Sequence, residues 1–127
     1  MNPTENSNII RSQVADASLR FGDWGPGYLL DSETCRIGIV RLRPGDEVEN
    51  HLHAESDESF IVVSGKAELW VDREQQASLV AGDIAQCKVG HEHFLRAFGE
   101  EMFEAYFIKS PAGGDDTRAV PWTPESN

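Results

Sequence analysis

Short apolar-rich runs divide the chain from residue 35 to residue 111, and most of them end at a glycine or proline. In one of them Ala67, Leu69 and Val71 alternate with charged or aromatic residues, which is the period-two pattern of a half-buried strand. No window shows the 3.6-residue period of an amphipathic helix. The chain is therefore expected to be all-β, an antiparallel sandwich or barrel. Seven strands are expected, at residues 35–43, 59–64, 66–72, 77–81, 84–89, 94–98 and 102–109.

The segments on either side of these strands are less regular. We expect an N-terminal tail and arm over residues 1–30, a barrel domain over 31–110 and a C-terminal tail over 111–127. Residues 13–20 are expected to form a short helix or an arm. Residues 21–28 contain three glycines and one proline and predict a loop. Its three aromatic side chains would cover the body, form a lid or pack against a second subunit, and Trp122 would anchor the C-terminal tail.

The net charge of −11 excludes some partners and locations. An acidic chain is repelled by nucleic acid and by anionic membrane surfaces, so neither is expected as a partner. The longest apolar runs have four residues, whereas a spanning helix needs about 20. No basic start leads into an apolar stretch, so we expect no secretory signal and a cytoplasmic location. Cys35 and Cys87 are far apart, and we expect two reduced thiols.

All four histidines lie in two His-x-His pairs, His51 with His53 and His91 with His93. Residues two apart on a strand share a face, so each pair can direct two imidazoles into one cavity. Imidazole is the commonest metal ligand in proteins. Glu58 follows His53 by five positions and can add a carboxylate from the start of the next strand. The pattern indicates a metal site.

The spacing of these residues resembles the cupin family of small double-stranded β-helix proteins. The first family motif is matched at every defining position, namely Gly45, His51, His53, Glu58 and Gly65. The second motif is matched at Gly82, Gly90 and His93, and departs from the family at Lys88 and Ala97. The family usually has proline and asparagine at those two positions, and neither is normally a ligand. The resemblance implies a double-stranded β-helix, also described as a jelly roll or cupin barrel.

The resemblance also implies a ligand set for a divalent transition metal, with Fe, Mn, Ni and Zn as alternatives. The implied ligands are His51, His53, Glu58 and His93. Three neutral imidazoles and one carboxylate leave such an ion with a net positive charge that attracts anionic substrate oxygens. Phe60 and Val62 share the parity of Glu58 on the expected strand and should line the barrel interior.

A general base is harder to choose. Its candidates are His91, Glu104, Tyr106 and the glutamate ligand itself, although an exposed turn is the simpler interpretation of His91. The directions of Arg41 and Arg96 are open, and an inward arginine would clamp a substrate carboxylate.

Three functions remain compatible with these residues. The first is an isomerase, epimerase or lyase acting on an anionic or polyol substrate such as a sugar or keto acid. The second is an Fe(II)-dependent dioxygenase, and the third is a non-catalytic module that binds or senses a small molecule. An apolar lining with iron would favour oxygenation, and an inward arginine or lysine would favour acid–base chemistry. We also expect a homodimer, with residues 21–28 as a candidate exchange arm.

Overall fold

The computed structural model describes residues 8–112 and 114–126, so residues 1–7 of the expected N-terminal tail lie outside it. Within these residues no helix is long and apolar enough to cross a membrane. Helical structure in the described segment is a single 3-10 turn, η1 (Val14–Asp16), where a short helix or arm was expected. The rest of the ordered structure is strand, which confirms the all-β class.

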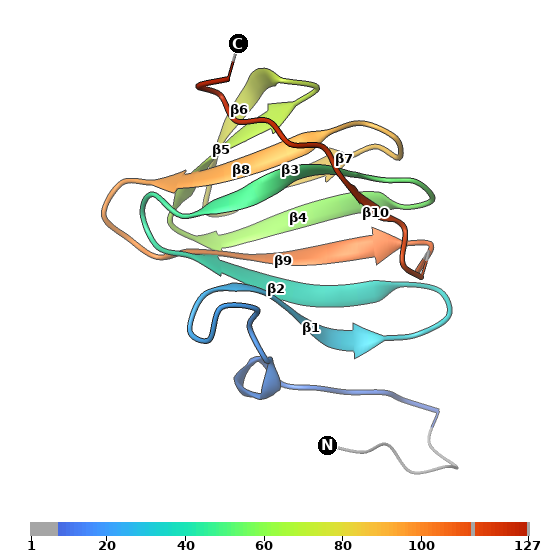
Figure 1. Cartoon of the computed structure of the whole chain (residues 1–127). Helices are drawn as coiled ribbons and strands as arrows, with labels where there is room; N and C mark the ends of the chain where they lie inside the picture. Colours follow the sequence, from blue (N-terminus) through green and yellow to red (C-terminus); the bar gives the residue numbers. More distant parts are fainter. Residues whose placement is uncertain (1–7, 113, 127) are drawn as a thin grey trace.

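Two five-stranded antiparallel sheets form the body of the molecule (Figure 1). The first contains, in spatial order, β1 (Gly25–Asp31), β2 (Arg36–Leu42), β9 (Phe103–Ser110), β4 (Asp57–Ser64) and β7 (Ile84–Cys87). The second contains β10 (Thr117–Ala119), β3 (Glu47–His53), β8 (His93–Phe98), β5 (Lys66–Val71) and β6 (Glu74–Val80). From β2 to β5 and again from β6 to β10, successive strands alternate between the two sheets, so the chain winds around a shared interior.

All seven expected strands form, and the structure adds β1, β3 and β10. The loop expected over residues 21–28 is wrong in its second half, because Gly25–Tyr28 pairs with β2. Similarly, part of the expected C-terminal tail pairs with β3. Both additions cover edges whose backbone groups would otherwise lack partners. The sheets therefore extend beyond residues 31–110 at both ends.

The hydrophobic core lies between the sheets and draws on both of them. The side chains of strand β9 alternate between the two faces of its sheet. Phe103, Ala105 and Phe107 are at most 4% exposed and face the core, whereas Glu104 and Tyr106 are only partly buried. Alternation along each strand thus decides which side chains can reach the interior.

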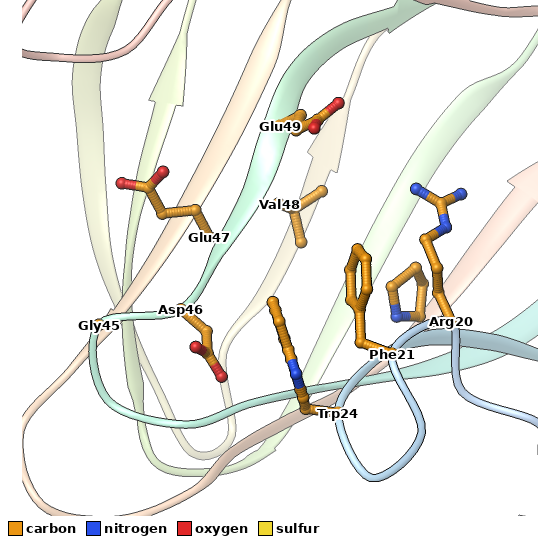
Figure 2. Close-up of a pocket in the computed structure, with 9 residues that line it drawn as sticks. Arg20, Phe21, Trp24, Gly45, Asp46, Glu47, Val48 and Glu49 are labelled. Atoms are coloured by element: carbon orange, nitrogen blue, oxygen red, sulfur yellow. The ribbon is translucent and has the colours of Figure 1, made fainter.

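The loop before β1 packs against the body, as its aromatic content indicates. Phe21 and Trp24 stack with ring centroids 4.3 Å apart, and Trp24 packs against the core. These two side chains border a hollow of about 320 Å³ beside the start of β3 (Figure 2). At the other end of the chain, Trp122 lies 5.8 Å from Trp70 and 6.0 Å from Phe94 between ring centroids. This contact confirms that Trp122 anchors the C-terminal segment.

Gly65, between β4 and β5, has a φ of +73°, and a Cβ there would lie 2.5 Å from the Met102 carbonyl oxygen. Gly65→Ala is expected to lower the free energy of unfolding by about 2–5 kcal/mol, from left-handed strain plus overpacking. Gly82 has a φ of +94° but no atom within 4 Å of such a Cβ. Gly82→Ala should therefore cost only the strain, about 1–2 kcal/mol. Urea unfolding measures both, and equal losses would contradict crowding at Gly65.

Candidate metal centre

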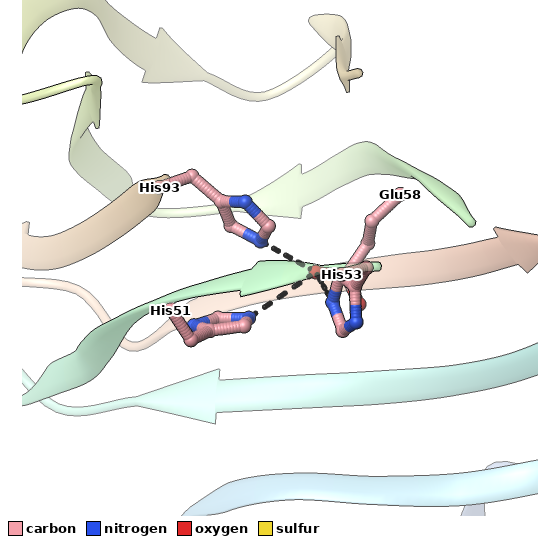
Figure 3. Close-up of side chains that lie close together, drawn as sticks. All are labelled: His51, His53, Glu58 and His93. Carbon is pink, nitrogen blue, oxygen red and sulfur yellow. Dashed lines mark hydrogen bonds and ion pairs between the residues drawn. The ribbon is translucent and has the colours of Figure 1, made fainter. Parts of the chain in front are cut away.

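The four predicted ligands come together between the two sheets (Figure 3). His51 and His53 lie on β3 and His93 on β8, where His51 and His93 are direct cross-strand partners. Glu58 reaches the same point from β4 in the other sheet. One ligand atom from each residue lies within 4.8 Å of the others. The His-x-His pair of β3 therefore points both imidazoles into one cavity, as the strand period predicts.

The three imidazoles present the same atom, Nε2, to one oxygen of Glu58. The distances to Glu58 Oε1 are 2.8 Å from His93, 3.2 Å from His53 and 3.7 Å from His51. The Nε2 atoms and this oxygen thus form the converging donor set. Imidazole nitrogens with a single carboxylate suit Fe, Mn, Ni or Zn, whereas calcium prefers an all-oxygen cage.

The remaining ring nitrogens show how the imidazoles are oriented. His51 Nδ1 donates to the Glu49 carbonyl oxygen at 2.6 Å, and His53 Nδ1 lies 3.2 Å from Asp116 Oδ1. In the metal-free structure Nε2 of each ring faces Glu58, and when a metal takes that place a proton on Nδ1 leaves the Nε2 lone pair to the metal, which is the usual arrangement at metal sites. His93 Nδ1 is buried and has no hydrogen-bond partner in the described part of the chain. The Nδ1 contacts of His51 and His53 are therefore the ones that metal-binding rings need.

Burial and charge set the protonation of the cluster. Burial acts to raise the pKa of Glu58, but hydrogen bonds from His51, His53 and His93 outweigh it and hold that pKa well below its usual value. Burial lowers the pKa of His93. At neutral pH the site therefore offers an ionised carboxylate and a neutral His93, the forms in which these groups bind metal.

The cluster opens into a cavity of about 540 Å³. Its lining is mainly apolar, from Pro26, Gly27, Tyr28, Val40, Val48, Phe60, Phe107 and Ala119. Outside the cluster, the polar groups of the lining are the side chains of Ser18, Arg20, Glu49 and Thr117 and the hydroxyl of Tyr28. Phe60 and Val62 are each 3% exposed, which confirms that they face the barrel interior. Arg20 and Glu49 also border the smaller hollow, so the two openings adjoin.

His91 lies outside this cavity. Its side chain is 55% exposed, and Nδ1 lies 2.6 Å from Asp72 Oδ2. The structure therefore confirms the simpler interpretation of His91 as an exposed turn residue, although it belongs to the same His-x-His pair as His93.

Two further candidate bases, Glu104 and Tyr106, do not line the cavity either, whereas the fourth candidate, Glu58, does. Glu104 and Tyr106 alternate with core-facing Phe107 and its neighbours and therefore lie on the outer face of the sheet. Glu104 pairs there with Arg41 at 3.4 Å. Arg96 also points outward and binds Glu47 and Glu125. The structure brings none of these outward-facing residues to the cluster.

Lys109 and Asp116 are charged, buried and absent from the predicted site. Each is 1% exposed, and their side chains lie 2.8 Å apart. Burial acts to raise the pKa of Asp116, but the hydrogen bond and charge of Lys109, together with hydrogen bonds from the Glu55 backbone and Ser56, outweigh it and bring that pKa to about 2. Parity with Phe107 on β9 could have placed Lys109 inside. Asp116 lies in a segment with no strand signal, so the sequence alone does not locate it.

Both cysteines are free. Cys87 pairs with Glu58 in the β4–β7 register and is 2% exposed. Burial, reinforced by the charge of Glu58, raises the pKa of Cys87 to about 12. The thiol therefore stays protonated at neutral pH, and its protonated sulfur is a poor ligand.

The fold is a double-stranded β-helix, and it encloses three imidazoles and one carboxylate. These two features define a class of small barrel proteins whose interior holds a set of side chains suited to bind a metal ion. The Cupin domain family matches residues 38–109, and the chain belongs to this family. The match runs from β2 through most of β9 and contains all four residues of the cluster. The resemblance in the sequence is thereby confirmed.

Solved structures agree on the fold. An uncharacterised conserved protein with a double-stranded β-helix domain from Klebsiella pneumoniae is 25% identical, with a TM-score of 0.76, over 92% of this chain and 100% of that chain. An RmlC-like cupin family protein from Methanocaldococcus jannaschii is 18% identical, with a TM-score of 0.69, over 84% of this chain and 93% of that one. Among curated proteins, "Polyketide synthase CurC" of Streptomyces cyaneus is 26% identical over 106 residues, covering 72% of this chain and 68% of the relative.

Proposed function

We propose that this cupin is a metal-dependent enzyme that isomerises, epimerises or cleaves a small carbonyl compound. The convergence of three Nε2 atoms and one carboxylate oxygen at the cavity carries the proposal (Figure 3). A divalent transition metal held there would supply a Lewis acid that polarises a substrate carbonyl and stabilises negative charge on its oxygen. Glu58 contributes the only negative charge among the four groups, so the loaded site favours a substrate with an anionic oxygen.

The residues that line the cavity indicate how polar its substrate is. Tyr28, Phe60 and Phe107 offer apolar contact, which suits a carbonyl compound with an apolar body better than a polyol. Arg20 is the cationic side chain among the described lining residues and can face an anionic group at the mouth. The polyketide synthase name of the Streptomyces cyaneus relative is consistent with such a carbonyl-rich substrate.

Proton transfer needs a titratable group that faces the cavity. Outside the cluster and Arg20, Glu49 and Tyr28 are the titratable groups among the described lining residues. We therefore assign the general base or acid to one of them. Tyr28→Phe or Glu49→Gln is expected to lower kcat by about 10²–10⁴-fold while metal retention stays unchanged. Tyr106→Phe, on the outer face, is the matched control. Full activity in both cavity variants would leave Glu58 as the base.

A dioxygenase is the second candidate, because the lining is mainly apolar and none of His91, Glu104 and Tyr106 lines the cavity. The test is a screen of metal-loaded protein against enolisable ketones and keto acids, under air and under argon. Turnover under argon supports the proposed acid–base enzyme. Turnover that requires iron and consumes oxygen supports the dioxygenase. Binding without turnover under either gas would replace both by a non-catalytic binding module.

The expected homodimer and cytoplasmic location stay predictions. β1 lies at the end of its sheet in the described structure, and Phe21 and Tyr28 are 50% and 45% exposed. An edge strand with exposed aromatic neighbours is a suitable surface for a second subunit. Light scattering at micromolar concentration checks this, and a monomer would count against it.

A further inference from the structure

A buried ion pair lies directly behind the candidate metal centre. Lys109 occupies the last inward-facing position of β9, and Asp116 immediately precedes β10. Lys109 Nζ donates to Asp116 Oδ1 at 2.8 Å, with both side chains removed from solvent. Neither residue belongs to the ligand cluster, so the presence of this charged pair in the interior requires an explanation.

Asp116 uses both carboxylate oxygens to hold the segment that follows β3. Oδ1, which also accepts from Lys109, lies 3.2 Å from His53 Nδ1. Oδ2 accepts the Glu55 backbone N–H at 3.1 Å, and the Asp116 carbonyl accepts the Ala54 N–H at 2.9 Å. The carboxylate therefore bonds to a ligand ring and to the chain just after it.

The pairing of β10 with β3 places the carboxylate there. Thr117 is the register partner of His53, and Ala119 is the partner of His51. Asp116 comes one residue before these paired positions, so its carboxylate lies beside Nδ1 of the His53 ring. Thr117 Oγ1 lies 3.3 Å from the same Nδ1 atom, as a neutral neighbour.

The three imidazoles differ in what orients them. His51 Nδ1 donates to a backbone carbonyl, and His93 Nδ1 has no partner in the described structure. Only His53, among the three, contacts a charged side chain through Nδ1. A carboxylate behind a histidine fixes its tautomer and raises its basicity as a ligand.

We infer that Asp116 is a positioning residue of the metal centre: held by Lys109, it keeps the His53 proton on Nδ1 and directs Nε2 at the metal. The C-terminal segment is then part of the site. This inference rests on the proposed metal centre. It differs from a purely structural ion pair because it predicts an effect on the His53 ring that persists when both charges are removed.

The experiment compares two double variants that both lack the ion pair. Lys109→Met with Asp116→Asn keeps a side-chain oxygen that can accept the His53 proton. Lys109→Met with Asp116→Leu removes that acceptor. Neither leaves an unpaired buried charge, which protects the fold. Circular dichroism verifies folding, and competition with a chelator measures Zn²⁺ affinity.

The asparagine variant is expected to bind Zn²⁺ within a few-fold of wild type, and the leucine variant about 10–100-fold more weakly. Nitrogen-15 shifts of the histidine rings, recorded without metal, should show a proton on His53 Nδ1 in the wild-type and asparagine proteins, in addition to any proton that Nε2 shares with Glu58. In the leucine variant the Nδ1 proton should be lost and only the one on Nε2 should remain. Equal affinities and an unchanged tautomer in both variants would overturn the inference. If the wild type binds no metal, the proposed function fails, and the tautomer comparison alone decides the role of Asp116.

Discussion

Replacing His93 with alanine is expected to abolish metal retention. Wild-type protein purified without added metal should hold about one equivalent of a transition metal. His93 Nε2 lies nearest to Glu58 among the three imidazoles and is almost completely buried. Its loss leaves three metal-ligand side chains and removes the one that β8 contributes. Elemental analysis, normalised to folded protein, gives the measurement.

Two further variants make the result interpretable. His51→Ala removes a ligand whose side chain is 14% exposed, so it should lose the metal with less damage to the fold. His91→Ala removes a histidine two positions from His93 that is 55% exposed and bound to Asp72. It should retain the full equivalent. Loss of metal in His91→Ala, or its retention in both ligand variants, would contradict the assignment of the centre.

Stability provides a second readout for the same variants. A ligand that binds only the native state at 100 times its Kd stabilises it by about 2.7 kcal/mol. For a domain of this size that corresponds to a rise in Tm of roughly 10 °C. Metal addition should produce this shift in wild type and in His91→Ala, but not in His93→Ala. An equal shift in all three proteins would indicate metal binding elsewhere.

Lys109→Met is expected to lower the free energy of unfolding by about 3–5 kcal/mol. The side chain is 1% exposed, and its ammonium is 2.8 Å from Asp116. Removing it leaves the Asp116 carboxylate buried without its cation. Urea denaturation of the metal-free protein measures the loss separately from metal binding.

Lys88→Met is the matched control for this loss, because Lys88 is exposed. It should change stability by no more than about 0.5 kcal/mol. Adding Asp116→Asn to Lys109→Met should recover most of the lost stability, since a neutral amide that can still accept the Glu55 N–H replaces an unpaired charge. If Lys109→Met were as stable as Lys88→Met, the buried pair would contribute nothing to folding.

Prediction of the fold succeeded where side chains alternate clearly and failed where backbone pairing alone makes a strand. Residues 66–72 carry an unbroken alternation and form β5 nearly as expected. β1 begins Gly-Pro-Gly, a composition typical of turns, and exists because the edge of β2 is available. β10 has three exposed residues and no apolar pattern, and it forms against β3. Neither strand has a signal in its own residues.

The site shows the same division. The spacing of His51, His53, Glu58 and His93 identified the cluster that the structure assembles. It did not identify a base, because Glu104 and Tyr106 lie on a strand whose outer face is also partly apolar. The buried face of such a strand is ambiguous until its partners are known.

By itself, the sequence determined the all-β class, the cupin resemblance and the four converging residues, because strand period and motif spacing are local properties of the chain. Only the tertiary structure decided that the cavity is mainly apolar, that His91, Glu104 and Tyr106 lie outside it and that Asp116 lies behind His53. These facts depend on which sheet faces meet and which edges are covered. Contacts between residues such as His53 and Asp116, 63 positions apart, are made by packing and leave no local pattern.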